Sequence, residues 1–310
     1  MLHEWRNIII CRSTIIRLHF AAMLLAISPV AAVLAAGPRE PLTFQNSGLY
    51  CGWNEYFTSP DSPFDYFIVP GEGPFEGRDN SGWNESLKLA RKNGKRVIAD
   101  LNPQVKLANG KWTNISLLTA DSTDAELDAF VRVIGEFFTQ VDINQLYAIT
   151  LGEEQVFWNG HVDILNKLYD KLKAKYDVPV YQWYSPSSGG SVPGINWPNL
   201  KADGWIADEY FLDQPNAEMA MRGYTILQKP FIQIIWAGGD KNASVPFIPE
   251  RFAAQFDVNR KYNIPTAYFT WYGEGGAWGW NESAPESLRN IFSMVLQNVS
   301  SAKAQASPPV

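Results

Sequence analysis

The stretch Leu146-Tyr-Ala-Ile-Thr-Leu-Gly-Glu-Glu-Gln155 decides the fold, because it is an apolar run that ends in two carboxylates. Helical patterns stand on both sides of it, over residues 123–138 and 162–175. A strand that is apolar on both faces and lies between helices is typical of a parallel sheet, which helices cover on both sides. We therefore expect the chemistry of this chain at the carboxyl end of the strand, near Glu153 and Glu154.

Residues 1–36 are expected to be a secretory signal peptide. A segment with three arginines precedes the apolar run 20–36, which ends in small residues. Cleavage after Ala35 or Ala36 would release a secreted chain, extracellular or periplasmic. The alternative is an uncleaved membrane anchor, because about 17 apolar residues can just span a bilayer. Pro29 and the alanines of the run favour cleavage.

The composition excludes several classes of function. Without residues 1–36 the formal charge changes from −6 to −8, that is, 23 basic against 31 acidic residues, and an acidic chain argues against nucleic acid as a partner. Only Cys51 and His161 would remain of their kinds, too few for a zinc–thiolate cluster or a histidine-rich metal site. We expect no cofactor, no metal, no stable membrane association after cleavage, and a monomer.

The pattern along the chain predicts a single α/β domain, a (β/α)8 TIM barrel over residues 37–302, followed by a disordered tail at 303–310. Strand-like runs occupy 49–57, 65–70, 96–101, 146–155, 179–184, 205–211, 231–236 and 266–272. Helical patterns occupy 83–93, 123–138, 162–175, 216–228, 249–262 and 283–299. The first connection is short and the fifth is irregular. The alternative, an open doubly wound sheet, usually carries a nucleotide fingerprint that this sequence lacks.

Side-chain alternation suggests which carboxylates enter the barrel. On the fourth strand the bulky set of Tyr147, Ile149 and Leu151 suits the helix-facing side, which leaves the set that leads to Glu154 to point inward. The same alternation places two further glutamates on one face of their strands. Glu209 shares its set with Ala207, and Glu274 shares its set with Tyr268, Thr270 and Tyr272.

Two inward carboxylates can cleave a glycosidic bond, because one protonates the leaving oxygen and the other acts as nucleophile or activates water. Glu154, Glu209 and Glu274 are our candidate catalytic residues. Weaker candidates are Glu153, Asp208, Asp100 and Glu55. The structural alternative is that acids at strand–helix junctions simply stabilise the N-terminus of the next helix.

Aromatic residues gather where the strands are predicted to end, and sugar rings stack their C–H faces on such side chains. Any single tryptophan could instead belong to the core. The predicted substrate-binding residues, with three amides that could bind hydroxyl groups, are Trp53, Asn54, Asn102, Gln182, Tyr184, Trp236, Trp271, Tyr272 and Trp278.

The end of the fourth strand, Thr150-Leu-Gly-Glu-Glu-Gln155, resembles the Asn-Glu ending of strand four in the (β/α)8 glycoside hydrolases of clan A. That resemblance implies that Glu154 is the acid/base and that Glu153 replaces the asparagine. The clan's nucleophile lies on strand seven, whereas here Ile235-Trp-Ala-Gly-Gly-Asp240 contains no glutamate. The α-galactosidase clan is similar in placing its pair on strands four and six, although its pair consists of aspartates.

These observations predict a secreted glycoside hydrolase that acts on a poly- or oligosaccharide. The alternative is a non-catalytic barrel that binds glycan through the same aromatic cleft. A metal-dependent hydrolase with an all-carboxylate site is a third reading, which a chelator would test.

Overall fold

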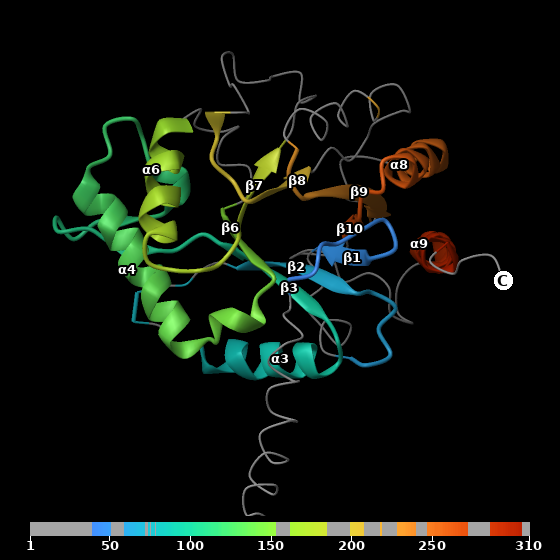
Figure 1. Cartoon of the computed structure of the whole chain (residues 1–310), viewed down its shortest axis with the longest axis horizontal. Helices are drawn as coiled ribbons and strands as arrows, with labels where there is room; N and C mark the ends of the chain where they lie inside the picture. The colour runs from blue at the N-terminus through green and yellow to red at the C-terminus, as the bar shows by residue number, and fades with distance from the viewer. Residues whose placement is uncertain are drawn as a thin grey trace, which may run out of the picture. The chain divides into compact units, whose positions relative to one another are not determined.

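The computed structural model describes residues 39–50, 59–71, 74, 76–77, 79–152, 162–184, 199–207, 218, 228–239, 247–271 and 286–305 (Figure 1). The chain divides into two compact units, Met1–Glu40 and Pro41–Val310, and the described elements belong to the second. The predicted signal peptide lies outside the described residues. Among the helices that are described, none combines the length and hydrophobicity that a bilayer crossing requires.

Eight parallel strands form a closed barrel. They are β1 (Ser47–Tyr50), β2 (Tyr66–Gly71), β3 (Arg96–Leu101), β6 (Ala148–Leu151), β7 (Val180–Tyr184), β8 (Gly204–Ala207), β9 (Phe231–Gly239) and β10 (Thr266–Trp271). Each strand pairs with the next of these in sequence, and β10 closes the barrel by pairing with β1. The predicted (β/α)8 barrel is therefore confirmed.

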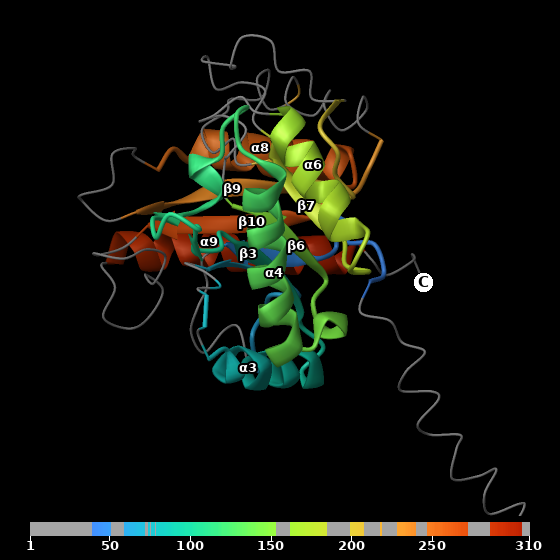
Figure 2. The same ribbon diagram turned by 90° about the vertical axis from the view of Figure 1, so that its left-hand side faces the viewer.

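Helices lie outside the strands (Figures 1 and 2). They are α3 (Ser81–Lys92), α4 (Asp124–Gln140), α6 (Val162–Lys173), α8 (Pro249–Lys261) and α9 (Glu286–Ala304). α4 begins with a capping box: the Thr123 hydroxyl accepts from the Glu126 N–H at 3.3 Å, and Glu126 Oε2 accepts from the Thr123 N–H at 2.7 Å. α9 continues to Ala304, past the predicted end of the barrel at residue 302. Of the helix predicted over 216–228, only Glu218 and Gln228 are described, and Glu218 is helical.

The connection from β3 to α4 contains structure that the sequence pattern did not predict. A small antiparallel hairpin pairs β4 (Val105–Lys106) with β5 (Trp112–Thr113), and the 3-10 helix η1 (Ile115–Leu117) follows. A second 3-10 helix, η2 (Ile143–Gln145), precedes β6. Elements of two or three residues are too short to show a period of two or of 3.6, so periodicity could not find them.

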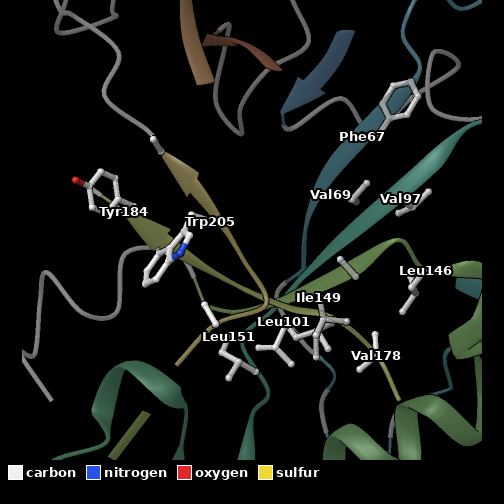
Figure 3. Close-up of a cluster of buried hydrophobic side chains, with 14 of the residues drawn as sticks. Phe67, Val69, Val97, Leu101, Leu146, Ile149, Leu151, Val178, Tyr184 and Trp205 are labelled. Carbon is white, nitrogen blue, oxygen red and sulfur yellow. The ribbon is translucent and has the colours of Figure 1, made fainter. Parts of the chain in front are cut away.

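Apolar side chains form two layers, one on each face of the strands. The outer cluster lies between strands and helices, and Figure 3 shows part of it, with Val97, Ile149 and Trp205 pointing from three different strands. The interior cluster fills the barrel. Its members are Tyr50, Tyr66, Ile68, Ile98, Tyr147, Ala148, Tyr181, Trp183, Ile206, Ile232, Ile234, Trp236, Ala267 and Phe269.

Two glycines make room for large rings inside the barrel. A Cβ atom on Gly48 would overlap the ring of Tyr66, and one on Gly204 would overlap the ring of Tyr181. Both tyrosines are almost completely buried. The interior is thus a packed core whose bulky residues face small ones on the neighbouring strands.

Candidate active site

A buried carboxyl group lies inside the barrel, near the carboxyl ends of β3 and β6. Asp100 is the fifth residue of β3 and is 4% exposed, and it pairs in register with Thr150 of β6, which is fully buried. The Thr150 hydroxyl donates a short hydrogen bond to Asp100 Oδ1. The two residues therefore join two neighbouring strands through their inward-pointing side chains.

The surroundings of Asp100 favour its neutral form. Desolvation by burial raises the pKa of Asp100 from its ordinary value of 3.8 to about 6, although the Thr150 hydroxyl and the Trp183 indole partly lower it. The Trp183 Nε1 is buried and makes no hydrogen bond of good geometry within the described part of the chain. Thr150 is therefore the partner that holds Asp100. A buried carboxyl with a raised pKa at this end of a barrel is a candidate functional group.

Four aromatic rings cross the barrel in the same interior cluster. Trp183 of β7 lies 5.5 Å from Tyr50 of β1 between ring centroids, and Tyr50 lies 5.1 Å from Phe269 of β10. Trp236 of β9 then packs on Phe269 at 5.4 Å with an angle of 61° between the rings. The Trp183–Tyr50 and Trp236–Phe269 contacts are edge-on and the Tyr50–Phe269 contact is tilted, and together they link β7 to the neighbouring strands β1, β10 and β9 through the barrel interior. Asp100 of β3 thus lies in an interior that also contains this aromatic row, and the Trp183 indole is near enough to lower its pKa.

The chain leaves β6 through a glycine in a left-handed conformation. Gly152 has φ +75°, a value that glycine adopts at little cost. Ile149 and Leu151 belong to the outer cluster, as predicted, and Thr150 points inward to Asp100. Strict alternation requires extended backbone, so it ends at Gly152 and no longer selects between the two glutamates that follow in the sequence.

Tyr147 was expected to face the helices with Ile149 and Leu151, and this is wrong. It belongs to the interior cluster, where its ring lies 6.1 Å from that of Tyr181 between centroids. The reason is that β6 begins at Ala148, so alternation does not extend back to Tyr147.

On two other strands the observed side-chain directions differ from those that alternation would need to bring Glu209 and Glu274 inward. On β8, Ile206 is in the interior cluster and Ala207 is in the outer one, so the set that includes Glu209 begins on the helix-facing side. On β10, Phe269 is inside and Tyr268 is outside, where it packs on Phe252 at 6.0 Å between ring centroids. The strand phases thus give no support to an inward Glu209 or Glu274.

Among the predicted substrate-binding residues, Asn102 and Trp236 lie where the barrel interior ends. Asn102 directly follows β3 and is half-buried, and its Oδ1 accepts the Ile115 N–H at 3.2 Å, which ties η1 to the end of the strand. Trp236 is 7% exposed and packs on Phe269 inside the barrel. A role for either residue in sugar binding stays a prediction.

Gln182 and Tyr184 lie on the other face of β7. Tyr184 belongs to the outer cluster, with its ring 6.0 Å from Trp205 and 5.6 Å from Phe231 between centroids (Figure 3). Gln182 is buried and lies between two residues of the interior cluster, so alternation places it on the same face as Tyr184. Their positions favour packing roles rather than contact with a sugar.

Most of the predicted site falls outside the described residues. These positions are the catalytic candidates Glu154, Glu209 and Glu274, the substrate-binding candidates Trp53, Asn54, Tyr272 and Trp278, and the weaker candidates Glu55, Glu153 and Asp208. Trp271 is the last residue of β10, and its side chain is not described.

Sequence reasoning ranked Asp100 low and did not consider Thr150 as its partner. The available signal was the run Val97-Ile-Ala-Asp-Leu101, in which a single acid interrupts an otherwise apolar strand. An acid in the body of a buried strand needs a partner, and the neighbouring strand could have been searched for one.

The closed ring of eight parallel strands defines a (β/α)8 barrel, and solved structures with a similar fold include glycoside hydrolases. No protein-family model matches the sequence, and neither does any curated protein sequence.

The similar solved structures include a β-mannanase of glycoside hydrolase family 113 from Alicyclobacillus acidocaldarius, with a TM-score of 0.54 and 11% sequence identity over 86% of this chain and 100% of that one. A β-1,4-mannanase of the same family has a TM-score of 0.54 and 13% identity over 86% and 100% of the two chains. A broad-specificity endoglucanase of family 5, subfamily 4, from Clostridium longisporum has a TM-score of 0.50 and 14% identity over 85% and 98%. At such identities the likeness shows the fold.

Proposed function

We propose that this chain is a secreted glycoside hydrolase that cleaves O-glycosidic bonds of a poly- or oligosaccharide with a pair of carboxylates. One observation carries the proposal: β6 ends beside the buried Asp100–Thr150 pair, and the sequence continues from Gly152 directly into Glu153 and Glu154. Catalytic residues of such barrels lie at the carboxyl ends of the strands. The similar barrels of the two mannanases and the endoglucanase support the same class of reaction.

Glu154 is proposed as the acid/base, and its partner is proposed to come from Asp208 or Glu209. Both acids follow β8 directly, and Glu209 is the one predicted from the sequence pattern. If the strand continues by one residue, the observed phase of β8, with Ile206 inside, favours Asp208 over Glu209 for the inward position. Glycosidases work with either type of acid, so residue type does not decide between them.

The first experiment measures hydrolysis by the purified chain. β-1,4-Mannan, glucomannan and cellulose are the first substrates to offer, because the similar structures include a β-1,4-mannanase and an endoglucanase. We expect release of reducing sugar from at least one glycan, and we expect a chelator to leave that release unchanged. Binding without release would instead favour the glycan-binding alternative.

Substitutions then test the carboxylates. Glu154→Gln is expected to lower kcat by about 10²- to 10⁴-fold, the usual contribution of a general acid or base, while sugar binding persists. Asp208→Asn and Glu209→Gln are compared in the same assay, and the one that lowers kcat to a similar extent identifies the partner. Glu85→Gln is the matched control, because Glu85 lies exposed on α3 in a pair with Lys88. Full activity in Glu154→Gln would refute the proposal.

Secretion is tested separately by expressing the full chain in a secreting host. The mass of the mature product should correspond to cleavage after Ala35 or Ala36. A product that retains residues 1–36 and stays with the membrane would support the anchor.

A further inference from the structure

Asp100 occupies a position that stability alone does not explain. Apart from Thr150, the residues that β2, β3 and β6 place in the interior cluster are apolar or aromatic, among them Ile68, Ile98 and Ala148. A carboxyl group in such surroundings loses its hydration and regains little unless a partner binds it. Apolar residues of similar size often stabilise a fold more than a buried acid does.

The partner of Asp100 lies at the end of the strand that precedes the proposed acid/base. Thr150 donates its hydroxyl hydrogen to Asp100 Oδ1, and two residues later Gly152 turns the chain with φ +75°. Thr150 is thus the last residue of β6 whose inward contact is described, and Glu153 and Glu154 follow it in the sequence.

At its carboxyl end, β6 pairs with β3 over a longer stretch than it pairs with β7. Its pairing with β7 covers Ile149 and Thr150, whereas its pairing with β3 continues to Leu151. The strand has four residues, so few backbone hydrogen bonds fix the point at which the chain leaves the barrel. The side-chain hydrogen bond between Asp100 and Thr150 adds a further restraint between β6 and β3.

We propose that Asp100 is a positioning residue of the carboxylate site, which holds the carboxyl end of β6 in place through Thr150. The inference rests on the proposed function and deepens it. Catalytic groups must be held within about 0.5 Å of their productive position, and supporting hydrogen bonds supply that accuracy. A displacement of a catalytic group by about 1 Å can lower the rate about 10²-fold, so loss of the Asp100–Thr150 hydrogen bond should lower kcat.

Two substitutions at Asp100 separate positioning from packing. Asp100→Asn keeps an oxygen that accepts the Thr150 hydroxyl but removes the charge that strengthens the bond, whereas Asp100→Leu removes the acceptor. We expect kcat to fall about threefold in Asp100→Asn and about thirtyfold in Asp100→Leu, with KM changed less than about threefold in both. The resistance to urea at pH 8 should follow the opposite order, because the apolar side chain suits the barrel interior best. A residue that only packs would lose activity and stability together.

Substitutions at Thr150 test the same bond from its other end. Thr150→Val removes the donor at nearly constant shape and should lower kcat about as far as Asp100→Leu, whereas Thr150→Ser keeps the donor and should restore most of kcat. The double variant Asp100→Leu/Thr150→Val should be no slower than either single one, since both remove one interaction. Thr139→Val, on the exposed face of α4, is the control for a threonine-to-valine change.

The outcomes distinguish this inference from the proposed function. If the unmodified chain cleaves a glycan and Glu154→Gln does not, but Asp100→Leu and Thr150→Val retain kcat, the positioning role is refuted and the glycosidase stands. The positioning role would also be refuted if the fold-decrease in kcat of the double variant equalled the product of the decreases of the two single variants. If the unmodified chain cleaves no glycan, the proposed function fails, and this inference fails with it.

Discussion

Asp100→Asn should make the protein more stable at neutral and alkaline pH than the unmodified chain. Burial raises the pKa of Asp100 from 3.8 to about 6, and the difference of about 2.2 corresponds to about 3 kcal/mol, at about 1.36 kcal/mol for each pKa unit. Asparagine resembles the neutral acid and retains an oxygen for the Thr150 hydroxyl. The variant therefore avoids the free-energy cost of ionising a carboxyl group inside the barrel.

The sign of the effect follows from proton linkage. Below the ordinary pKa of 3.8 the carboxyl is neutral in both folded and unfolded chains, and its full contribution to stability is present. As the pH rises towards about 6, the unfolded chain releases this proton first, so the free energy of unfolding falls. Above the raised pKa near 6 the whole contribution of about 3 kcal/mol is lost. The free energy of unfolding of Asp100→Asn minus that of the unmodified protein should thus rise by about this amount between acid and alkaline pH.

Urea unfolding of both proteins at several pH values from about 4 to about 8 measures that difference, and other titrating groups cancel in it. Asp203→Asn provides a control of opposite sign. Although burial would raise the pKa of Asp203, hydrogen bonds from the Val180 N–H, Tyr169 and Lys173 hold it below its ordinary value. Relative to the unmodified protein, the free energy of unfolding of Asp203→Asn should be reduced more at neutral pH than at acid pH. A difference for Asp100→Asn that stays constant with pH, or that falls as pH rises, would refute the reasoning.

Three further substitutions test the packing. Gly204→Ala should lower the free energy of unfolding by about 1–3 kcal/mol in urea, because its Cβ atom would overlap the ring of Tyr181, and an unchanged value would contradict the packed interior. Thr123→Ala should cost about 1 kcal/mol through loss of the capping box of α4, whereas removal of the exposed Thr139 hydroxyl should cost little. Tyr184→Ala should cost about 3–5 kcal/mol by emptying its place beside Trp205. A raised KM for Tyr184→Ala at unchanged stability would restore the original prediction that this residue binds sugar.

The number and order of the strands could be predicted from the sequence, because each strand is a mainly apolar run and the helices between them show separate amphipathic patterns. The capping box of α4 and the proline that begins α8 are helix-start features of the same local kind. These features depend on residues close together in the chain. The pairing of Asp100 with Thr150 joins residues fifty positions apart, and no local pattern records which residues meet across a barrel wall.

The direction of individual side chains could not be predicted for a physical reason. A strand of a parallel barrel is apolar on both faces, so its sequence lacks the contrast between polar and apolar residues that fixes the phase of a surface strand. Ile206 and Ala207 illustrate this, because both are apolar and either could face inward. On β6 the inward Thr150 is polar, and there the phase at Ile149 and Leu151 was predicted correctly.

The packing of the barrel interior decides where a glycan could bind. The rings of Trp183, Tyr50 and Phe269 meet across the barrel at centroid distances of 5.5 and 5.1 Å, and Trp236 continues the row. A sugar cannot enter below that layer without displacing buried aromatic rings. In the proposed reaction, the acids that touch the substrate would therefore be ones that follow the strands in the sequence, as Glu153 and Glu154 follow β6. Because Asp100 is 4% exposed, the role proposed for it in that reaction is indirect, and its bonded neighbour Thr150 precedes Glu153 and Glu154 in the sequence.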